Sequence, residues 1–346
     1  ASDVYKRQIY TYVGNAGMRK ELRQMHVAVT DEETASPEFE RAYADYKKTY
    51  GGMYDTLDMR KILEQKEKMS GYEPQGVWGS WIVRNYDRLQ KRVEQIRKTG
   101  EGTYDFYPGS WYKLHTTLYG KLWKKLILQT AVLMILSMLY LMDYERIYKT
   151  QDLVLATTTG KKMMEKKMLA GALCGLFYAG LLTAFTLLVF FAAVPFQNLW
   201  HVPVAACMVA EPRLQMMYPF VTFWRLEQWR YLLLALVVLV GLLGIVAAVT
   251  ATVQLFLQNS YFSFAVLGLL FMGAYLLAYV QMGNVWDLIR ELFNPTVLYV
   301  TSGGWFMEND LCLSFAGNEF AVLFCSGTAA VCLMAVGKRR YHRLEV

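Results

Sequence analysis

The side chains that most often perform catalysis or bind metals are few and scattered in this 346-residue chain. Four histidines are present, and they lie far apart: His26, His115, His201 and His342. No HxxxH spacing joins two of them, so a pair of imidazole ligands on one helix is not predicted. Residues 159–162 read Thr-Gly-Lys-Lys, without the upstream glycine and the final Ser or Thr of a phosphate-binding loop. We therefore expect no catalytic, metal or cofactor site on this chain, and we do not expect it to be an enzyme.

The cysteines also lack a spacing that would indicate chemistry. The five are Cys174, Cys207, Cys312, Cys325 and Cys332, and none belongs to a CxxC pair. Three lie inside apolar segments, so we interpret the cysteines as small buried hydrophobic residues. A disulfide between Cys207 and Cys312 is the alternative.

One polar segment, 143–167, combines charge with a short apolar stretch. It reads Asp-Tyr-Glu-Arg-Ile-Tyr-Lys-Thr-Gln-Asp-Leu-Val-Leu-Ala-Thr-Thr-Thr-Gly-Lys-Lys-Met-Met-Glu-Lys-Lys. Residues 153–155 form an apolar knob, 157–160 a turn, and the lysines lead into the next apolar run. The segment is either a positively charged loop and nothing more, or a short helix that binds a cytoplasmic partner and passes force to two membrane helices.

Long uncharged runs flank this segment and must position it. Hydrophobic residues make up 55% of the chain, more than the roughly 45–50% of soluble domains. Residues 168–210 and 231–286 contain no Asp, Glu, Lys or Arg, and each run exceeds the ~20 residues that a membrane helix needs. The predicted spans are 126–142, 168–195, 231–253, 262–281 and 320–337. In the second span, Gly171 and Gly175 form a GxxxG pair that could let a neighbouring helix approach closely.

The charge next to the spans predicts their orientation. Four basic residues follow the last span at once: Lys338, Arg339, Arg340 and Arg343. By the positive-inside rule the C-terminus is then cytoplasmic. Counting back places 143–167 and 254–261 inside, and 196–230, 282–318 and 9–125 outside. The basic segment 143–167 agrees with this orientation, whereas the lysines of 121–125 do not.

Residues 9–120 are expected to form an extracytoplasmic helical domain, and 121–346 a transmembrane domain. A helix is predicted at about 55–69 and another at 77–98. The second has a narrow apolar seam of five residues: Ile82, Tyr86, Leu89, Val93 and Ile96. This seam favours a helical hairpin packed on itself; a partner-binding coiled coil is the alternative. We interpret residues 1–8 as an adapter-derived artefact. Because an exported domain needs a preceding signal or span, six spans are expected in the intact protein, with five present here.

In the segment 143–167 the sequence resembles the permease subunits of type-2 ATP-binding-cassette (ABC) exporters. That family carries an acid after its second span, then a pattern like leucine-leucine-x-threonine-proline-x-arginine, and a final lysine at its third span. The residues that match this pattern are Glu145, Leu153, Leu155, Thr157, Thr159, Lys161 and Lys167. Two features depart from it: no glycine follows the acid, and Thr159 stands where proline is common. The resemblance covers about 120–346 and includes the turn 258–260, an external half-inserted segment at about 285–312 and the basic tail.

The resemblance implies a multi-pass permease of the bacterial cytoplasmic membrane that works in export or efflux. A cytoplasmic ABC ATPase subunit would dock on 143–167 and would hold the ATP and magnesium, leaving this chain without a cofactor. A second permease subunit, identical or different, would pair with this one in the lipid bilayer, and no nucleic acid is implied. A membrane-anchored sensor or scaffold with an external ligand-binding helical domain is the alternative. A membrane-embedded enzyme would need polar catalytic pairs within the spans, which the sequence does not supply.

Overall fold

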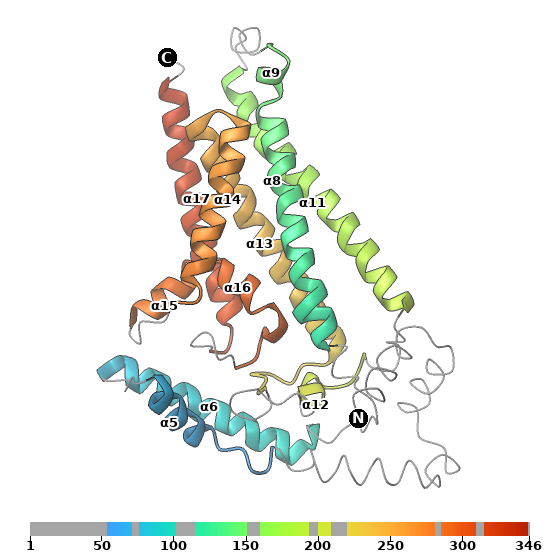
Figure 1. Ribbon diagram of the computed structural model, residues 1–346, viewed down its shortest axis with the longest axis vertical. Helices are drawn as coiled ribbons and strands as arrows, with labels where there is room; N and C mark the ends of the chain where they lie inside the picture. Colours follow the sequence, from blue (N-terminus) through green and yellow to red (C-terminus); the bar gives the residue numbers. More distant parts are fainter. Residues whose placement is uncertain are drawn as a thin grey trace. The chain divides into compact units, whose positions relative to one another are not determined.

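The computed structural model describes residues 54–70, 76–101, 115–150, 160–193, 200–208, 220–280, 285–308 and 315–344 (Figure 1). Within these ranges the regular elements are helices, and no residue belongs to a strand. Five of the helices are long and apolar enough to cross a membrane. An all-α polytopic membrane protein, as the sequence predicts, is therefore what the described residues form.

The five candidate spans coincide with the five predicted apolar runs. They are Thr116–Met142, Met163–Ala193, Gln228–Leu257, Ser260–Leu277 and Asn318–Tyr341. The helices that contain them are η2 (Thr116–Leu122) continuing into α8 (Trp123–Met142), α11 (Gly160–Ala193), α13 (Gln228–Leu257), α14 (Ser260–Leu277) and α17 (Asn318–Leu344). Most of them extend past the predicted ends, because a helix continues through the polar residues at a membrane surface. The fourth instead ends at Leu277 rather than near 281. The first begins with a turn of π-helix that the sequence did not predict.

The chain divides into two compact units, each built from three separate segments. Unit 1 comprises 1–120, 186–234 and 306–316, and unit 2 comprises 121–185, 235–305 and 317–346. The division passes through α11 and α13, so each unit holds part of these helices. Each unit is described by itself below.

Small residues allow close helix packing in unit 2. A Cβ added at Gly171 would lie 2.9 Å from Met138 Sδ, and one added at Gly175 would lie 2.5 Å from Met134 Sδ. Helices α8 and α11 therefore approach each other at the GxxxG pair, where only a hydrogen fits. Helix α13 packs against α17 around a second cluster, formed by Ile245, Ala248, Val249, Leu323, Ala330 and Met334.

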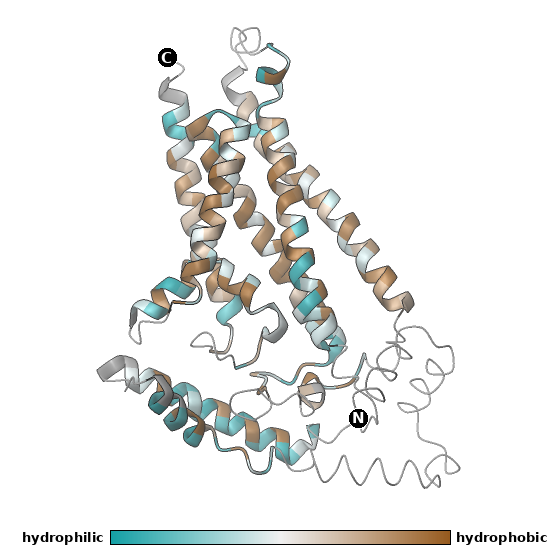
Figure 2. Ribbon diagram, in the orientation of Figure 1, coloured by the Kyte–Doolittle hydropathy of each residue, from teal (hydrophilic) through white to brown (hydrophobic). Residues whose placement is uncertain are grey.

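Much of the apolar surface of unit 2 faces outward. Only 17% of the apolar part of α11 and 11% of that of α14 are buried within the chain, and Figure 2 shows apolar residues along these helices. Side chains such as Leu173 and Phe177 are more than half exposed, as expected of surfaces that lipid covers. Cys174 and Cys332 are exposed too, so the interpretation of the cysteines as buried was wrong for these two: apolar character in a span does not distinguish a lipid-facing side chain from a buried one. Cys312 lies outside the described residues.

Three short helices lie between α14 and α17: α15 (Val285–Leu292), α16 (Thr296–Val300) and η4 (Ser302–Gly304). The burial pattern of α15 is the reverse of that of a helix in a soluble protein. Its apolar residues Trp286 and Ile289 are exposed, whereas the acidic residues Asp287 and Glu291 are buried. On its polar face, Arg290 lies 3.6 Å from Asp287 and 3.9 Å from Glu291. Arg290 donates to the Leu277 carbonyl at 2.9 Å.

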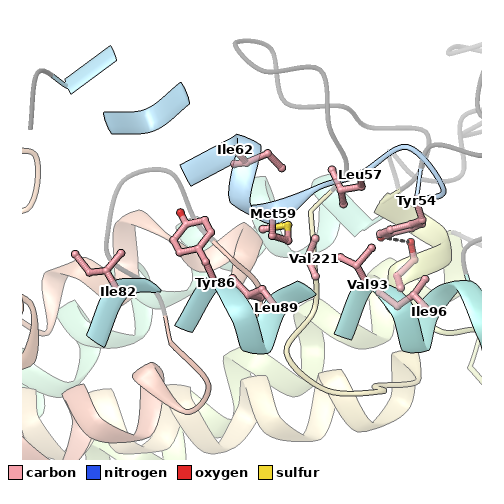
Figure 3. Close-up of a cluster of buried hydrophobic side chains, with 11 residues drawn as sticks. Tyr54, Leu57, Met59, Ile62, Ile82, Tyr86, Leu89, Val93, Ile96 and Val221 are labelled. Atoms are coloured by element: carbon pink, nitrogen blue, oxygen red, sulfur yellow. Dashed lines mark hydrogen bonds between the residues drawn. The ribbon is translucent and has the colours of Figure 1, made fainter. Parts of the chain in front are cut away.

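In unit 1, the two helices α5 (Met59–Ser70) and α6 (Gly76–Thr99) form a hairpin, which confirms the two helices predicted for this part of the chain. The five seam residues of α6 are buried, as Figure 3 shows. They pack on Met59 and Ile62 of α5, and also on Ala205 of α12 (Val204–Met208) and on Val221. The hairpin thus shares its core with segments far away in the sequence.

Polar contacts reinforce this shared core of unit 1. Arg92 forms a bidentate ion pair with Glu101, at 2.6 and 3.2 Å, and donates through Nε to the Thr222 carbonyl at 3.2 Å. Burial raises the pKa of Glu101, but hydrogen bonds and charge from Arg92, with help from Thr99 and Arg225, outweigh it and hold this pKa below its ordinary value. Tyr54 donates to the carbonyls of Ala205 and Phe220, at 3.2 and 3.0 Å.

Candidate functional site

Two of the site residues that the sequence singles out, Glu145 and Lys167, lie near the end of α8 in unit 2. Helix α8 is followed at once by the short helix α9 (Tyr144–Ile147). The chain then turns at Lys149, whose φ of 56° lies in the left-handed region, where a non-glycine residue is uncommon. The turn is closed by a hydrogen bond of 2.8 Å from the Thr150 amide to the Glu145 carbonyl. The segment therefore leaves the membrane helix in a defined direction.

An ion pair joins Glu145 of α9 to Lys167 of α11. These two residues enclose the polar segment, and the structure brings them together although the whole segment lies between them in sequence. Their side chains are only 13% and 15% exposed. An ion pair shielded to this degree is screened less than a surface pair and is more sensitive to the loss of one partner. It fixes α9 against the beginning of the second span.

A second contact joins the end of α8 to the turn between α13 and α14. Asp143 Oδ2 accepts hydrogen bonds from the Ser260 hydroxyl, at 2.8 Å, and from the Ser260 amide, at 3.4 Å. Within the turn, the Asn259 side chain caps α14 by accepting from the Phe262 amide at 3.1 Å. The Ser263 hydroxyl donates to Gln254 Oε1 at 2.7 Å and so links the two helices. These hydrogen bonds stabilise the turn, and Asp143 joins it to the end of α8.

Two further contacts extend these connections to the last helix. Lys338 of α17 lies 3.4 Å from Glu165 of α11, and the Arg340 guanidinium lies 4.9 Å from the centre of the Phe256 ring of α13. We call the pairs Asp143–Ser260, Glu145–Lys167, Glu165–Lys338 and Arg340–Phe256 the polar belt. It connects all five long helices of unit 2 at one end.

The structure describes only part of the predicted coupling residues. Leu153, Leu155, Thr157 and Thr159 lie outside the described residues. Lys161 stands in the first turn of α11, and its side chain is likewise outside the description. Glu145 and Lys167 are in contact, and Gly171 and Gly175 follow Lys167 along α11.

Sequence reasoning predicted Glu145 and Lys167 as site residues and missed the other six members of the polar belt: Asp143, Glu165, Phe256, Ser260, Lys338 and Arg340. Asp143 could have been found, because it is the first charged residue after the first span and ends a run of seventeen uncharged residues from 126 to 142. The pairing of Ser260 with Asp143 carries no signal in a single sequence, because more than a hundred residues separate them.

The belt offers structural rather than catalytic chemistry. Its carboxylates contact an ammonium group, a hydroxyl or a backbone amide, so they serve as anchors between helices. Among the described residues, no group of three or more His, Cys, Asp or Glu side chains could hold a metal ion. What the arrangement can do is transmit a displacement of α9 to the membrane helices.

Comparisons with known proteins add no relative. The chain matches no protein-family model, no curated protein and no solved structure.

Proposed function

We propose that this chain is the membrane permease subunit of an ABC exporter, driven by ATP that a separate cytoplasmic ATPase subunit hydrolyses. The observation that carries the proposal is the Glu145–Lys167 ion pair, which joins the two ends of the segment that resembles the coupling segment of type-2 ABC permeases. The ion pair ties α9 to α11, so a displacement of the segment would act on both flanking spans.

The polar belt supports a mechanical role for the segment. Force applied to α9 would reach α8 directly and α11 through Glu145–Lys167. The Asp143–Ser260 contact would pass it to α13 and α14, and Glu165–Lys338 to α17. ATP-driven closure of the partner subunits could then change how the spans are arranged and switch the pathway between its inward- and outward-facing states.

The middle of the spans supports an energy source outside this chain. Carriers driven by protons or sodium ions need charged or protonatable groups such as Asp, Glu, His, Lys or Arg at membrane depth. The apolar runs 126–142, 168–193, 231–257, 260–277 and 320–337 contain none of these five residue types. Hydroxyls such as those of Thr130 and Thr183 donate to carbonyls of their own helices, at 2.8 and 2.7 Å. Such a surface suits lipidic, peptide or drug-like cargo moving along a subunit interface.

The proposed orientation follows the charge distribution of the sequence. The belt end of unit 2, with segment 143–167 and the basic C-terminal residues, would face the cytoplasm of a bacterial cell. Residues 9–120 would then lie outside the cytoplasmic membrane. A second permease subunit would complete the transporter.

The docking step is tested by replacing the apolar knob. If a neighbouring gene encodes an ABC ATPase, that ATPase is co-expressed with the tagged full chain. ATPase recovery and vanadate-sensitive ATP hydrolysis are then measured for wild type, for Leu155→Asp and for Lys161→Glu/Lys162→Glu. Both variants should lose the ATPase. Lys166→Glu is the matched control, because Lys166 is exposed and makes no ion pair or hydrogen bond among the described residues.

Two outcomes would decide against the proposal. Recovery of the ATPase at wild-type level with Leu155→Asp would contradict docking on 143–167. If the neighbouring gene encodes a kinase or sigma factor that binds the wild-type chain, the sensor alternative takes its place.

A further inference from the structure

A lysine lies beside the end of a chain of aromatic rings, at the end of unit 2 that is remote from the polar belt. We call this group the Lys124 patch, and its members are Lys124, Phe271, Tyr275, Tyr279 and Tyr299. The Lys124 ammonium donates to the Val300 carbonyl at 3.3 Å and lies 5.3 Å from the centre of the Tyr299 ring. Successive ring pairs lie 5.3 to 6.2 Å apart between centres, so the aromatic surface is continuous.

The patch lies at the depth of lipid headgroups. Lys124 precedes Asp143 by 19 residues along the first span, and Tyr279 follows Ser260 by 19 residues. At 1.5 Å per residue both distances are about 28 Å, close to the ~30 Å thickness of the hydrocarbon core. Because Asp143 and Ser260 are hydrogen-bonded to each other, they define one membrane surface. Lys124 and Tyr279 therefore reach the opposite surface together.

The patch presents hydrogen-bond donors that have no partner among the described residues. An ammonium group has three N–H donors. Among the described residues, the Lys124 ammonium donates one hydrogen bond, to the Val300 carbonyl, and its other contact is with the face of the Tyr299 ring. The Tyr299 hydroxyl has no hydrogen-bond partner within the described part of the chain. Burial and the nearby Tyr275 raise the pKa of Tyr299. A hydrogen bond between the Tyr279 and Tyr275 hydroxyls, together with partial burial, raises the pKa of Tyr279 to about 12. Both phenols thus stay protonated, as donors must.

We propose that the Lys124 patch is a binding site for an anionic phospholipid. The Lys124 ammonium and the Tyr299 hydroxyl would bind the phosphate, and Phe271 and Tyr279, which are 38% and 45% exposed, would line the upper acyl chains. Phosphatidylcholine fits poorly, because its headgroup carries a cation of its own next to a site whose charged side chain is a lysine. The proposal does not depend on transport, since it rests on this patch alone.

The test compares two lipids on the purified full chain. The protein is prepared in a mild detergent, phosphatidylglycerol or phosphatidylcholine with the same acyl chains is added, and the thermal unfolding midpoint is followed against lipid concentration. Wild type should bind phosphatidylglycerol more tightly than phosphatidylcholine. Lys124→Gln should weaken that binding about fivefold, the effect of about one lysine near an anionic headgroup. Tyr299→Phe, which keeps the ring, should weaken it about twofold to threefold.

The controls are on the same helical turns of the first span. Lys121 and Lys125 are exposed and have no ion pair or hydrogen bond among the described residues, so Lys121→Gln and Lys125→Gln should leave the affinity within about twofold. Equal affinity of wild type for the two lipids would overturn the proposal, even if no Lys124 variant folds. Phosphatidylglycerol binding that is unchanged in Lys124→Gln would also overturn it. The same holds if glycerol phosphate, which has no acyl chains, stabilises the protein as much as phosphatidylglycerol does. Stabilisation by self-association instead of lipid would show that a second copy covers the patch.

Discussion

Glu145–Lys167 and Glu165–Lys338 are two Glu–Lys pairs at the same end of unit 2, and burial distinguishes them. The first pair is 13% and 15% exposed, whereas Glu165 and Lys338 are 55% and 31% exposed. We expect Glu145→Gln to lower the free energy of unfolding by about 2 kcal/mol, between the values of exposed and fully buried pairs. Glu165→Gln should lower the free energy of unfolding by only about 0–1 kcal/mol. Thermal or denaturant unfolding in detergent measures both, and the exchange Glu145→Lys/Lys167→Glu should recover part of the loss.

The buried Arg92–Glu101 pair of unit 1 predicts a dependence of stability on pH. The folded pKa of Glu101 is lower than its ordinary value of 4.5, so the unfolded chain binds the proton more tightly. The pair's contribution is therefore complete above about pH 5 and is lost as the pH falls through the folded pKa. Glu101→Gln should be less stable than wild type at pH 7, and the difference should narrow below pH 4.5. A difference that stays constant from pH 7 to pH 3.5 would contradict this assignment.

Single residues could be assigned from the sequence only where a pattern marked them. Glu145 and Lys167 belong to a recognisable pattern, and the structure brings them into contact. Ser260 and Glu165 are ordinary polar residues, and their roles depend on which helix ends meet. That arrangement is set by packing over the whole length of the spans, which no local signal encodes.

At the scale of the helices, close packing between α8 and α11 gives a sharp test. Gly175→Ala would place a Cβ 2.5 Å from Met134 Sδ and 3.2 Å from Met134 Cα, so backbone as well as side chain must shift. We expect a loss of about 1–3 kcal/mol in the free energy of unfolding. Gly180→Ala on the same helix meets nothing within 4 Å and should be neutral or stabilising by up to about 1 kcal/mol. Equal effects of the two substitutions would show that the helices do not depend on this contact.

The helices themselves were well predicted, because length and apolarity define a span and the seam from Ile82 to Ile96 has helical spacing. The π-helical turn η2 and the reversed burial pattern of α15 were not predicted. Both depend on tertiary context. In η2, Leu118 and Tyr119 are buried, and in α15 the Arg290 guanidinium donates to the Leu277 carbonyl of α14 and lies near Asp287 and Glu291 of its own helix. The helix propensities of single residues do not predict burial in η2 or the contacts of the charged residues in α15.

At the scale of the whole chain, unit 1 extends beyond the predicted domain 9–120, because it also includes residues 186–234 and 306–316. The core of the hairpin includes Ala205 and Val221, and Tyr86 lies 3.5 Å from Glu308. Three segments separated by membrane helices thus build one unit, since the loops between spans return to the same place. A single sequence shows each loop as polar and aromatic but carries no signal that they meet.

The proposed orientation predicts which residues a membrane-impermeant maleimide reaches in intact cells. In a chain whose own cysteines are replaced, Glu64→Cys on α5 should react from outside, because Glu64 is exposed and belongs to 9–120. Tyr148→Cys and Tyr261→Cys should react only after permeabilisation, although their native side chains are 55% and 91% exposed. Both positions are next to the Asp143–Ser260 contact, so they must behave alike whatever the orientation. If only one of these two positions is labelled in intact cells, the belt end does not lie on one side of the membrane. If both are labelled in intact cells, the orientation is the reverse of the proposed one. Segment 143–167 would then be out of reach of any cytoplasmic ATPase.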